Sequence, residues 1–139
     1  MFGALDTSTS GLVAQRANLD VIAGNIAMRE VTRDEKGQPN PYRRRVVLLG
    51  SGDPAHGAGA TGVHVAKIVQ DPSPGELRWD PGHPDAAQDG PQKGYVRMSN
   101  VDYHTEMVNA MVAVRAYEAN LSVAEMAKHM LTSTLTLLA

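Results

Sequence analysis

The chain has 139 residues, the length of a single domain, and its 13 basic and 15 acidic residues leave a net charge of −2. This balance argues against a general nucleic-acid-binding surface, and the absence of cysteine excludes disulfide bonds and cysteine-based metal sites. Aromatic residues make up only 4% of the chain, which is fewer than a self-sufficient globular core usually contains.

The N-terminal segment, residues 1–30, predicts an amphipathic helix. Its first eight residues lack the basic segment and apolar stretch of a secretory signal peptide. Asp6, Thr7 and Ser8 are good N-cap residues, and the amphipathic pattern after them continues to about Met28. The apolar stripe has members seven residues apart and one intermediate member: Leu5, Leu12, Leu19, Ile26 and Ile22.

A polar residue, Asn25, lies beside this stripe. It either hydrogen-bonds across a helix interface, where a polar group weakens packing but fixes register, or it faces solvent near the helix end. The spacing alone is compatible with both interpretations.

The middle of the chain, residues 31–98, predicts a small β-rich domain with turns rich in glycine and proline. Its strand candidates are residues 42–49, 63–69, 76–79 and 95–98. The glycine-rich segment 51–62 predicts a flexible loop, and it lacks the lysine and the following helix that a phosphate-binding loop requires.

Two motifs in this domain raise the question of binding. Arg43, Arg44 and Arg45 would suit an acidic partner or anionic lipid, but neighbouring strand residues face opposite sides, so a solvated strand edge is the better interpretation. The sequence Asp-Pro-Gly-His-Pro-Asp at 80–85 has one histidine and two carboxylates, but the usual metal-ligand spacing is missing. We expect it to form a turn that orients an interface loop.

The C-terminal segment, residues 99–139, predicts a long helix that starts at the pair Ser99 and Asp102. Apolar residues recur every three or four positions along it, which places them on one side of a helix. The stripe consists of Met107, Ala110, Val114, Tyr117, Leu121, Ala124, Leu131, Leu135 and Leu138. Lys128 interrupts it and either pairs with an acidic group of a neighbouring subunit or extends to solvent.

Further apolar residues, including Met111 and Val112, lie off this stripe, so the helix needs cover on several sides. The N-terminal helix is long enough to cover only part of it. The sequence therefore predicts an α+β fold in which long N- and C-terminal helices pair as an antiparallel coiled-coil-like unit, with a small central β-rich domain. We expect the ends to order during assembly; a self-contained helical hairpin on a β unit is the alternative.

The predicted assembly interface comprises Leu5, Leu12, Leu19, Ile22, Asn25, Ile26, Met107, Val114, Tyr117, Leu121, Leu131, Leu135 and Leu138. No phosphate loop, serine-nucleophile elbow or zinc-protease motif occurs, so no catalytic, cofactor or metal site is predicted. No run of about 18 apolar residues predicts a membrane-spanning helix.

Several segments carry a family resemblance. Residues 10–16 (SGLVAQR) and 19–27 (LDVIAGNIA) resemble the N-terminal signature of bacterial flagellar rod and hook proteins. Further segments follow in the expected order and resemble the proximal rod proteins of the flagellar basal-body rod family: YRRRVV at 42–47, DPSP at 71–74, DPGHPDA at 80–86, GYV at 94–96 and RAYEAN at 115–120.

This resemblance implies a structural rod subunit in the periplasm that transmits torque from motor to hook and is exported without a cleaved signal peptide. Its implied partners are other copies of itself, other flagellar rod proteins, MS-ring and rod-junction proteins and the flagellar type III export apparatus, with no nucleic acid or small-molecule substrate. A sister rod protein, a cytoplasmic coiled-coil adaptor that forms a small oligomer, and a small hydrolase are the alternatives.

Overall fold

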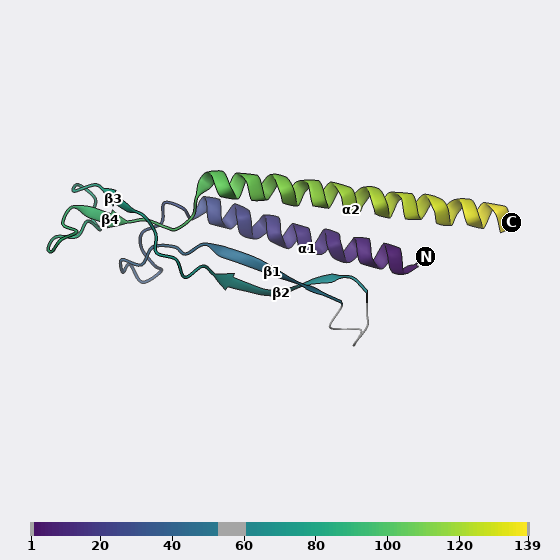
Figure 1. Cartoon of the computed structure of the whole chain (residues 1–139), viewed down its shortest axis with the longest axis horizontal. Coiled ribbons are helices and arrows are strands. Elements are labelled where there is room, and N and C mark those ends of the chain that lie inside the picture. The colour runs from purple at the N-terminus through teal and green to yellow at the C-terminus, as the bar shows by residue number, and fades with distance from the viewer. Residues whose placement is uncertain (1, 53–60, 139) are drawn as a thin grey trace.

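The computed structural model of the chain describes residues 2–52 and 61–138. Its elements are α1 (Phe2–Ala27), β1 (Arg45–Ser51), β2 (Val63–Gln70), β3 (Leu77–Trp79), β4 (Tyr95–Arg97) and α2 (Tyr103–Leu138). α1 and α2 run side by side in opposite directions, so the start of α1 and the end of α2 lie at the same end of the molecule (Figure 1). The predicted α+β fold with paired terminal helices is confirmed.

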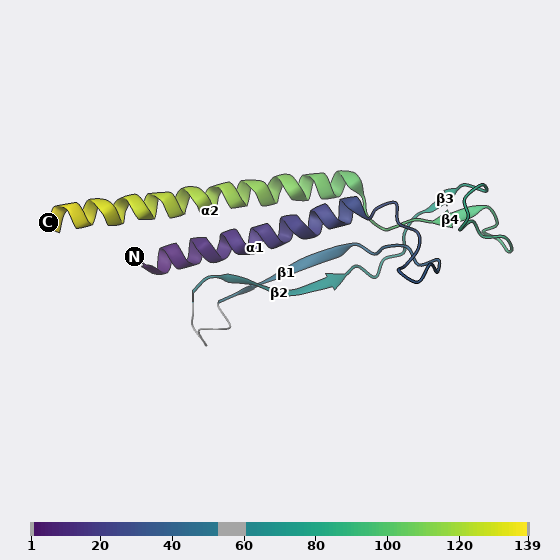
Figure 2. The ribbon, with the colours of Figure 1, turned by 180° about the vertical axis from the view of Figure 1, so that it is seen from behind.

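α1 is the middle layer of the helical part. β1 and β2 form an antiparallel hairpin that contacts α1 on the side away from α2, as both views show (Figures 1 and 2). The pairing register shifts between Leu48 and Leu49, which leaves Ala66 of β2 as the extra residue of a bulge. α1 therefore has a helix on one side and a sheet on the other.

β3 and β4 pair antiparallel in a second, separate sheet beyond the ends of the helices (Figure 2). All four predicted strands are present, with boundaries shifted by up to three residues. The largest shift is at β1, which begins at Arg45 and not at Tyr42. The reason is that the Arg44 backbone N–H donates to the Asn100 side chain and not to a strand partner. Of the predicted flexible loop at 51–62, residues 53–60 lie outside the described residues.

Both helices begin at different residues from those expected. α1 starts at Phe2, and the hydroxyls of Thr7 and Ser8 donate to the carbonyls of Gly3 and Ala4 one turn earlier. These residues are therefore inside the helix and do not cap it. In the described part of the chain, neither helix has an apolar stretch long enough to cross a membrane.

The N-cap of α2 is Asp102. Its carboxylate accepts the Thr105 hydroxyl at 2.7 Å and the His104 backbone N–H at 3.0 Å, and these bonds lower the pKa of Asp102. Ser99, the expected first capping residue, instead accepts the Val101 N–H close by. The start signal was in the right place, but its second residue performs the capping.

Candidate assembly surface

The two helices keep one register along their overlap, and two contacts define it. The Asn25 side chain of α1 donates to Glu106 of α2 at 2.8 Å. Gly11 lies fourteen residues before Asn25, and Asn120 lies fourteen residues after Glu106. A Cβ added to Gly11 would lie 2.6 Å from the Asn120 side chain. Because fourteen residues are close to four helical turns, both contacts lie on the same faces of the helices.

The contact line on α2 consists of Glu106, Ala113, Asn120 and Ala127, which are buried or half-buried and seven residues apart. The predicted stripe lies one residue later along the chain. Its members Met107, Val114 and Leu121 are 40%, 40% and 42% exposed. Two of the four residues on the contact line, Ala113 and Ala127, are small, and small side chains allow helices to approach closely because little side-chain volume separates them.

The same offset holds on α1. Gly11 and Asn25 are buried at the contact line, while the predicted residues Leu12 and Ile26, which follow them, are half-buried beside it. Most members of the predicted stripes therefore lie beside the line at which the two helices meet and not on it. Sequence reasoning did not identify the close approach of Gly11 to Asn120 or the burial of Ala113 and Ala127.

The other predicted interface residues are distributed around this contact. Buried within the subunit are Ile22 and Asn25; half-buried are Leu5, Leu12, Leu19, Ile26, Tyr117 and Leu131; exposed are Met107, Val114, Leu121 and Leu135. The side chain of Leu138 lies outside the described residues. Lys128 is exposed. Its exposure is compatible both with pairing to an acidic group of a neighbouring subunit and with extension to solvent.

A buried polar cluster of Asn25, Arg44 and Glu106 joins α1, α2 and the start of β1. Glu106 is fully buried, and its carboxylate accepts Arg44 Nε and Asn25 Nδ2, each at 2.8 Å. Asn25 Nδ2 also donates to the Arg45 carbonyl at 2.8 Å, while Asn25 Oδ1 accepts the Arg45 N–H at 2.9 Å. The Tyr42 hydroxyl donates to the same oxygen at 3.0 Å. The Asn25 amide thus binds the β1 backbone as a neighbouring strand would.

This cluster decides two questions that the sequence raised. Asn25 hydrogen-bonds across the helix interface and does not face solvent. The solvated-edge interpretation is wrong for Arg44, whose half-buried guanidinium neutralises Glu106, although Arg43 and Arg45 are exposed. Sequence reasoning missed Glu106, and no local signal marks it, because its burial depends on Asn25 and Arg44 from distant segments of the chain.

The Asp-Pro-Gly-His-Pro-Asp segment forms turns, as expected, and its last residue binds the loop after α1. The Asp85 carboxylate accepts Arg33 Nε and the Thr32 hydroxyl, each at 2.7 Å. These hydrogen bonds lower the pKa of Asp85 from its ordinary value. His83 Nδ1 accepts the Asp85 N–H at 3.1 Å, so the histidine supports the turn.

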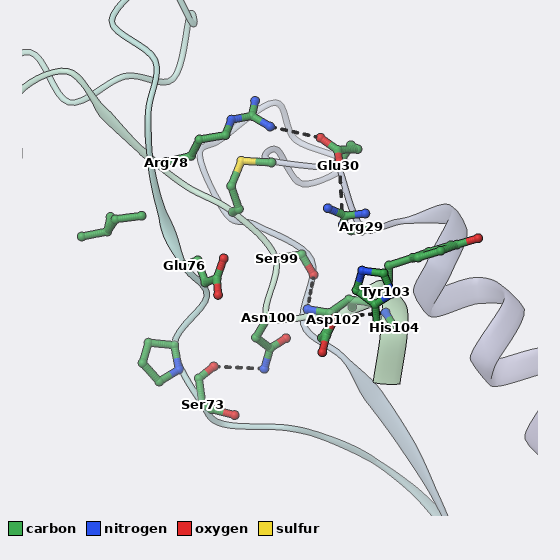
Figure 3. Close-up of a pocket in the computed structure, with 14 residues that line it drawn as sticks. Arg29, Glu30, Ser73, Glu76, Arg78, Ser99, Asn100, Asp102, Tyr103 and His104 are labelled. Atoms are coloured by element: carbon green, nitrogen blue, oxygen red, sulfur yellow. Dashed lines mark hydrogen bonds and ion pairs between the residues drawn. The ribbon is translucent and has the colours of Figure 1, made fainter. Parts of the chain in front are cut away.

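A cleft of about 500 Å³ lies where α2 begins, between the turn after α1 and residues 73–78 (Figure 3). Glu30 lies between Arg29, at 3.8 Å, and Arg78, at 3.4 Å. All three side chains are exposed, so these ion pairs add little stability. Within the described ranges, no three histidine or acidic side chains gather closely enough to hold a metal ion. The geometry is that of a junction between elements.

The outer side of α2 carries a wide apolar surface. Its exposed members include Val108, Met111, Val112, Met126, Met130 and Leu137, and Val112 is 64% exposed. α2 has 36 residues against 26 in α1, so it is longer by about 15 Å and its last turns extend beyond the start of α1 (Figure 1). We call this surface, with Met107, Val114 and Leu121, the outer face of α2.

Comparison with known proteins agrees with this architecture. The family model described as "Flagellar basal body rod FlgEFG protein C-terminal" matches residues 92–137, a range that includes all but the last residue of α2. A protein of Borreliella burgdorferi named flagellar basal-body rod protein FlgC is 37% identical over 150 residues, covering 99% of this chain and 97% of its own.

Proteins with the same name in Yersinia enterocolitica and Bacillus subtilis are 41% and 37% identical. The matches cover 99% and 96% of this chain and 97% and 95% of the relatives. The similarity thus extends over both helices and the hairpins between them. The chain belongs to the FlgC family of flagellar basal-body rod proteins.

Proposed function

We propose that this chain is a non-catalytic structural subunit of the flagellar basal-body rod and acts in flagellum-dependent motility. It assembles through its terminal helices with other copies of itself and with other rod proteins. The observation that carries this proposal is the outer face of α2, where apolar side chains stay exposed along a helix that, among the residues the structure describes, packs against α1 on one side.

The composition of this face supports burial in an assembly. Large exposed apolar surfaces in a single subunit mark interaction sites, because water is released when another surface covers them. Only four side chains between 107 and 138 carry a formal charge, and the exposed Arg115 and Glu118 pair with each other at 2.8 Å. Few charges therefore oppose the approach of a neighbour.

The length and arrangement of the helices suit torque transmission from motor to hook. α1 and α2 would run together in the rod, and contacts with several neighbours along each helix would resist twisting as a unit. We assign assembly to residues 1–30 and 99–139, and the outer part of the subunit to the β-rich residues 31–98.

The family membership supports a location in the basal body, and we place the subunit in its periplasmic rod. Its further partners are then MS-ring and rod-junction proteins, and it leaves the cytoplasm through the flagellar type III export apparatus without a cleaved signal peptide. A cytoplasmic coiled-coil adaptor is the competing function.

Deletion of the gene and fractionation of purified basal bodies separate these functions. We expect the deletion to abolish swimming, the intact chain to restore it, and a tagged chain to copurify with basal bodies. Two results together would overturn the rod assignment: the tagged chain stays in the cytoplasm as a small oligomer, and the deletion strain swims normally.

A further inference from the structure

We propose that the buried polar cluster of Asn25, Arg44 and Glu106 selects one axial register of the helix pair and excludes a register shifted by seven residues. The register itself is a property of the subunit. Its consequence for the rod, the height at which the outer face of α2 is presented to neighbours, rests on the proposed function.

The contact line alone allows the shifted register. In the observed register, equal offsets place Asn18 level with Ala113, between the Gly11–Asn120 and Asn25–Glu106 contacts. A shift of one heptad would place Gly11 level with Ala113 and Asn18 level with Glu106. Gly11 and Ala113, which are both small, would then face each other, and Asn18 would supply the amide that Asn25 supplies now.

Arg44 removes this ambiguity. Asn25 binds both backbone groups of Arg45, at 2.8 and 2.9 Å, and so holds the neighbouring Arg44 at one height on α1. Asn18 lies two turns away from this point. In the shifted register Glu106 would meet an amide without its guanidinium, and a fully buried carboxylate without a countercharge is strongly unfavourable.

Other contacts of the cluster point the same way. The Arg44 N–H donates to Asn100 Oδ1 at 2.7 Å, six residues before Glu106, so Arg44 contacts both the start of β1 and the approach to α2. Arg44 Nη1 also lies 4.0 Å from Asp71, just after β2. A buried polar residue that sets helix register at some loss of stability is well known in coiled coils, and here the determinant combines three segments.

Disulfide trapping measures the register directly, because the chain has no cysteine of its own. The Cβ position of Gly11 lies 3.0 Å from Asn120 Cγ, so G11C/N120C reports the observed register. G11C/A113C reports the register shifted by one heptad. Each pair is oxidised in the purified full-length chain, and the intramolecular disulfide is quantified by mass spectrometry after alkylation of free thiols.

With the cluster intact, we expect the 11–120 disulfide to form and the 11–113 disulfide to be absent. Arg44→Met with Glu106→Gln removes the charge pair but keeps similar side-chain volumes. We expect both disulfides to form in this background, and Asn18→Ala, added to it, to suppress the 11–113 product. The matched control, Arg115→Met with Glu118→Gln, changes an exposed pair of the same residue types and should leave only the 11–120 product.

Exclusive 11–120 trapping in the R44M/E106Q background would overturn the proposal, and so would the absence of that product in the intact chain. If R44M/E106Q loses its helical circular dichroism, the trapping experiment is done with Glu106→Gln alone. The 11–113 disulfide is expected to form in that variant, and its absence would overturn the proposal. Disulfide trapping uses the purified subunit, so its result does not depend on whether the chain is found in basal bodies. A failure of the register proposal can therefore be distinguished from a failure of the rod assignment.

Discussion

Glu106 is the residue at which local and tertiary forces meet. It lies in the first turn of α2, where a negative charge is favourable, yet its side chain has no contact with solvent. Removing a carboxylate from water is costly unless a countercharge and hydrogen-bond donors replace the water. Arg44 and Asn25 supply both, from segments 62 and 81 residues away in the chain.

Loss of the countercharge should therefore be severe. Arg44→Met leaves the buried Glu106 carboxylate unpaired, and we expect the free energy of unfolding to fall by about 3–5 kcal/mol in urea denaturation followed by circular dichroism. Arg115→Met, which removes one partner of the exposed pair, should change it by no more than about 0.5 kcal/mol. Equal effects of the two substitutions would contradict the role assigned to Arg44.

Two glycines of α1 offer a matched comparison at the helix contact. A Cβ on Gly11 would lie 2.6–3.3 Å from the Asn120 side chain, whereas a Cβ on Gly24 would meet nothing within 4 Å. We expect Gly24→Ala to stabilise the chain by about 0.5–1 kcal/mol through helix propensity. Gly11→Ala gains the same helix propensity but has to displace the Asn120 side chain, so its free energy of unfolding should lie about 1 kcal/mol or more below that of Gly24→Ala. Thermal unfolding of the two variants checks the difference, and Asn120→Ala should rescue only the second.

At the scale of elements, short connections hold the hairpins to the helices. The loop after α1 and the turns at 80–86 meet through Asp85, and the segment before β3 lies against the chain after β4. Neither connection is a long apolar contact. A few polar bonds and one close backbone approach therefore determine how the outer part of the subunit is attached.

The Asp85 connection should weaken in acid. The hydrogen bonds from Arg33 and Thr32 lower the pKa of Asp85, so its stabilising contribution is complete above the unfolded pKa of about 4 and is lost as the pH falls through the lower folded value. We expect the hydrogen-exchange protection factors of amides around Thr32 and Ala86, which correct for the intrinsic effect of pH on exchange, to fall below about pH 4. Asp85→Asn should remove this pH dependence, while Asp89→Asn, on an exposed residue nearby, should retain it.

Gly75 should tolerate no side chain. Its Cβ position lies 1.7 Å from the Met98 carbonyl oxygen and 3.0 Å from the Ser99 carbonyl carbon, and the Met98 N–H donates to the Glu76 carbonyl at 2.8 Å. Gly75→Ala must therefore separate the two backbone segments. We expect amides of β3 and β4 to lose hydrogen-exchange protection. Gly82→Ala, with its nearest neighbour at 3.8 Å, is the control and should keep it.

At the scale of the whole molecule, the described residues cover α1 on two sides and α2 on one. The elongated subunit consequently leaves apolar side chains exposed on the longer helix. The last turns of that helix extend beyond the partner helix (Figures 1 and 2). A shape of this kind can associate with neighbours along its whole length. The proposed assembly requires this property.

Charges on the outer face of α2 should separate folding from assembly. Val112→Asp and Met126→Glu replace exposed side chains, so we expect the free energy of unfolding to change by about 0.5 kcal/mol or less. Both should abolish swimming and copurification with basal bodies, because a buried unpaired charge opposes association. Ile68→Glu, at an apolar position on β2 that is 48% exposed, should retain both. Normal swimming of the α2 variants would contradict the assembly surface.

Some features were within reach of the sequence for definable reasons. Periodic apolar residues encode a helix locally, as in the stripe from Met107 to Leu135, and the capping carboxylate of Asp102 acts on residues two and three positions later. Glycine and proline likewise mark the turns around Asp85. Each of these signals operates over a few residues, so it can be read without knowledge of the fold.

Sequence by itself determined the two long helices, the four strands, the family and the excess of apolar surface. Only the tertiary structure decided which line of each helix makes the contact, how the hairpins divide into two sheets and that Glu106 is buried with Asn25 and Arg44. The physical reason is separation along the chain. Close approach at Gly11 and compensation of a buried charge depend on partners that folding brings together from distant segments, and no local pattern specifies them.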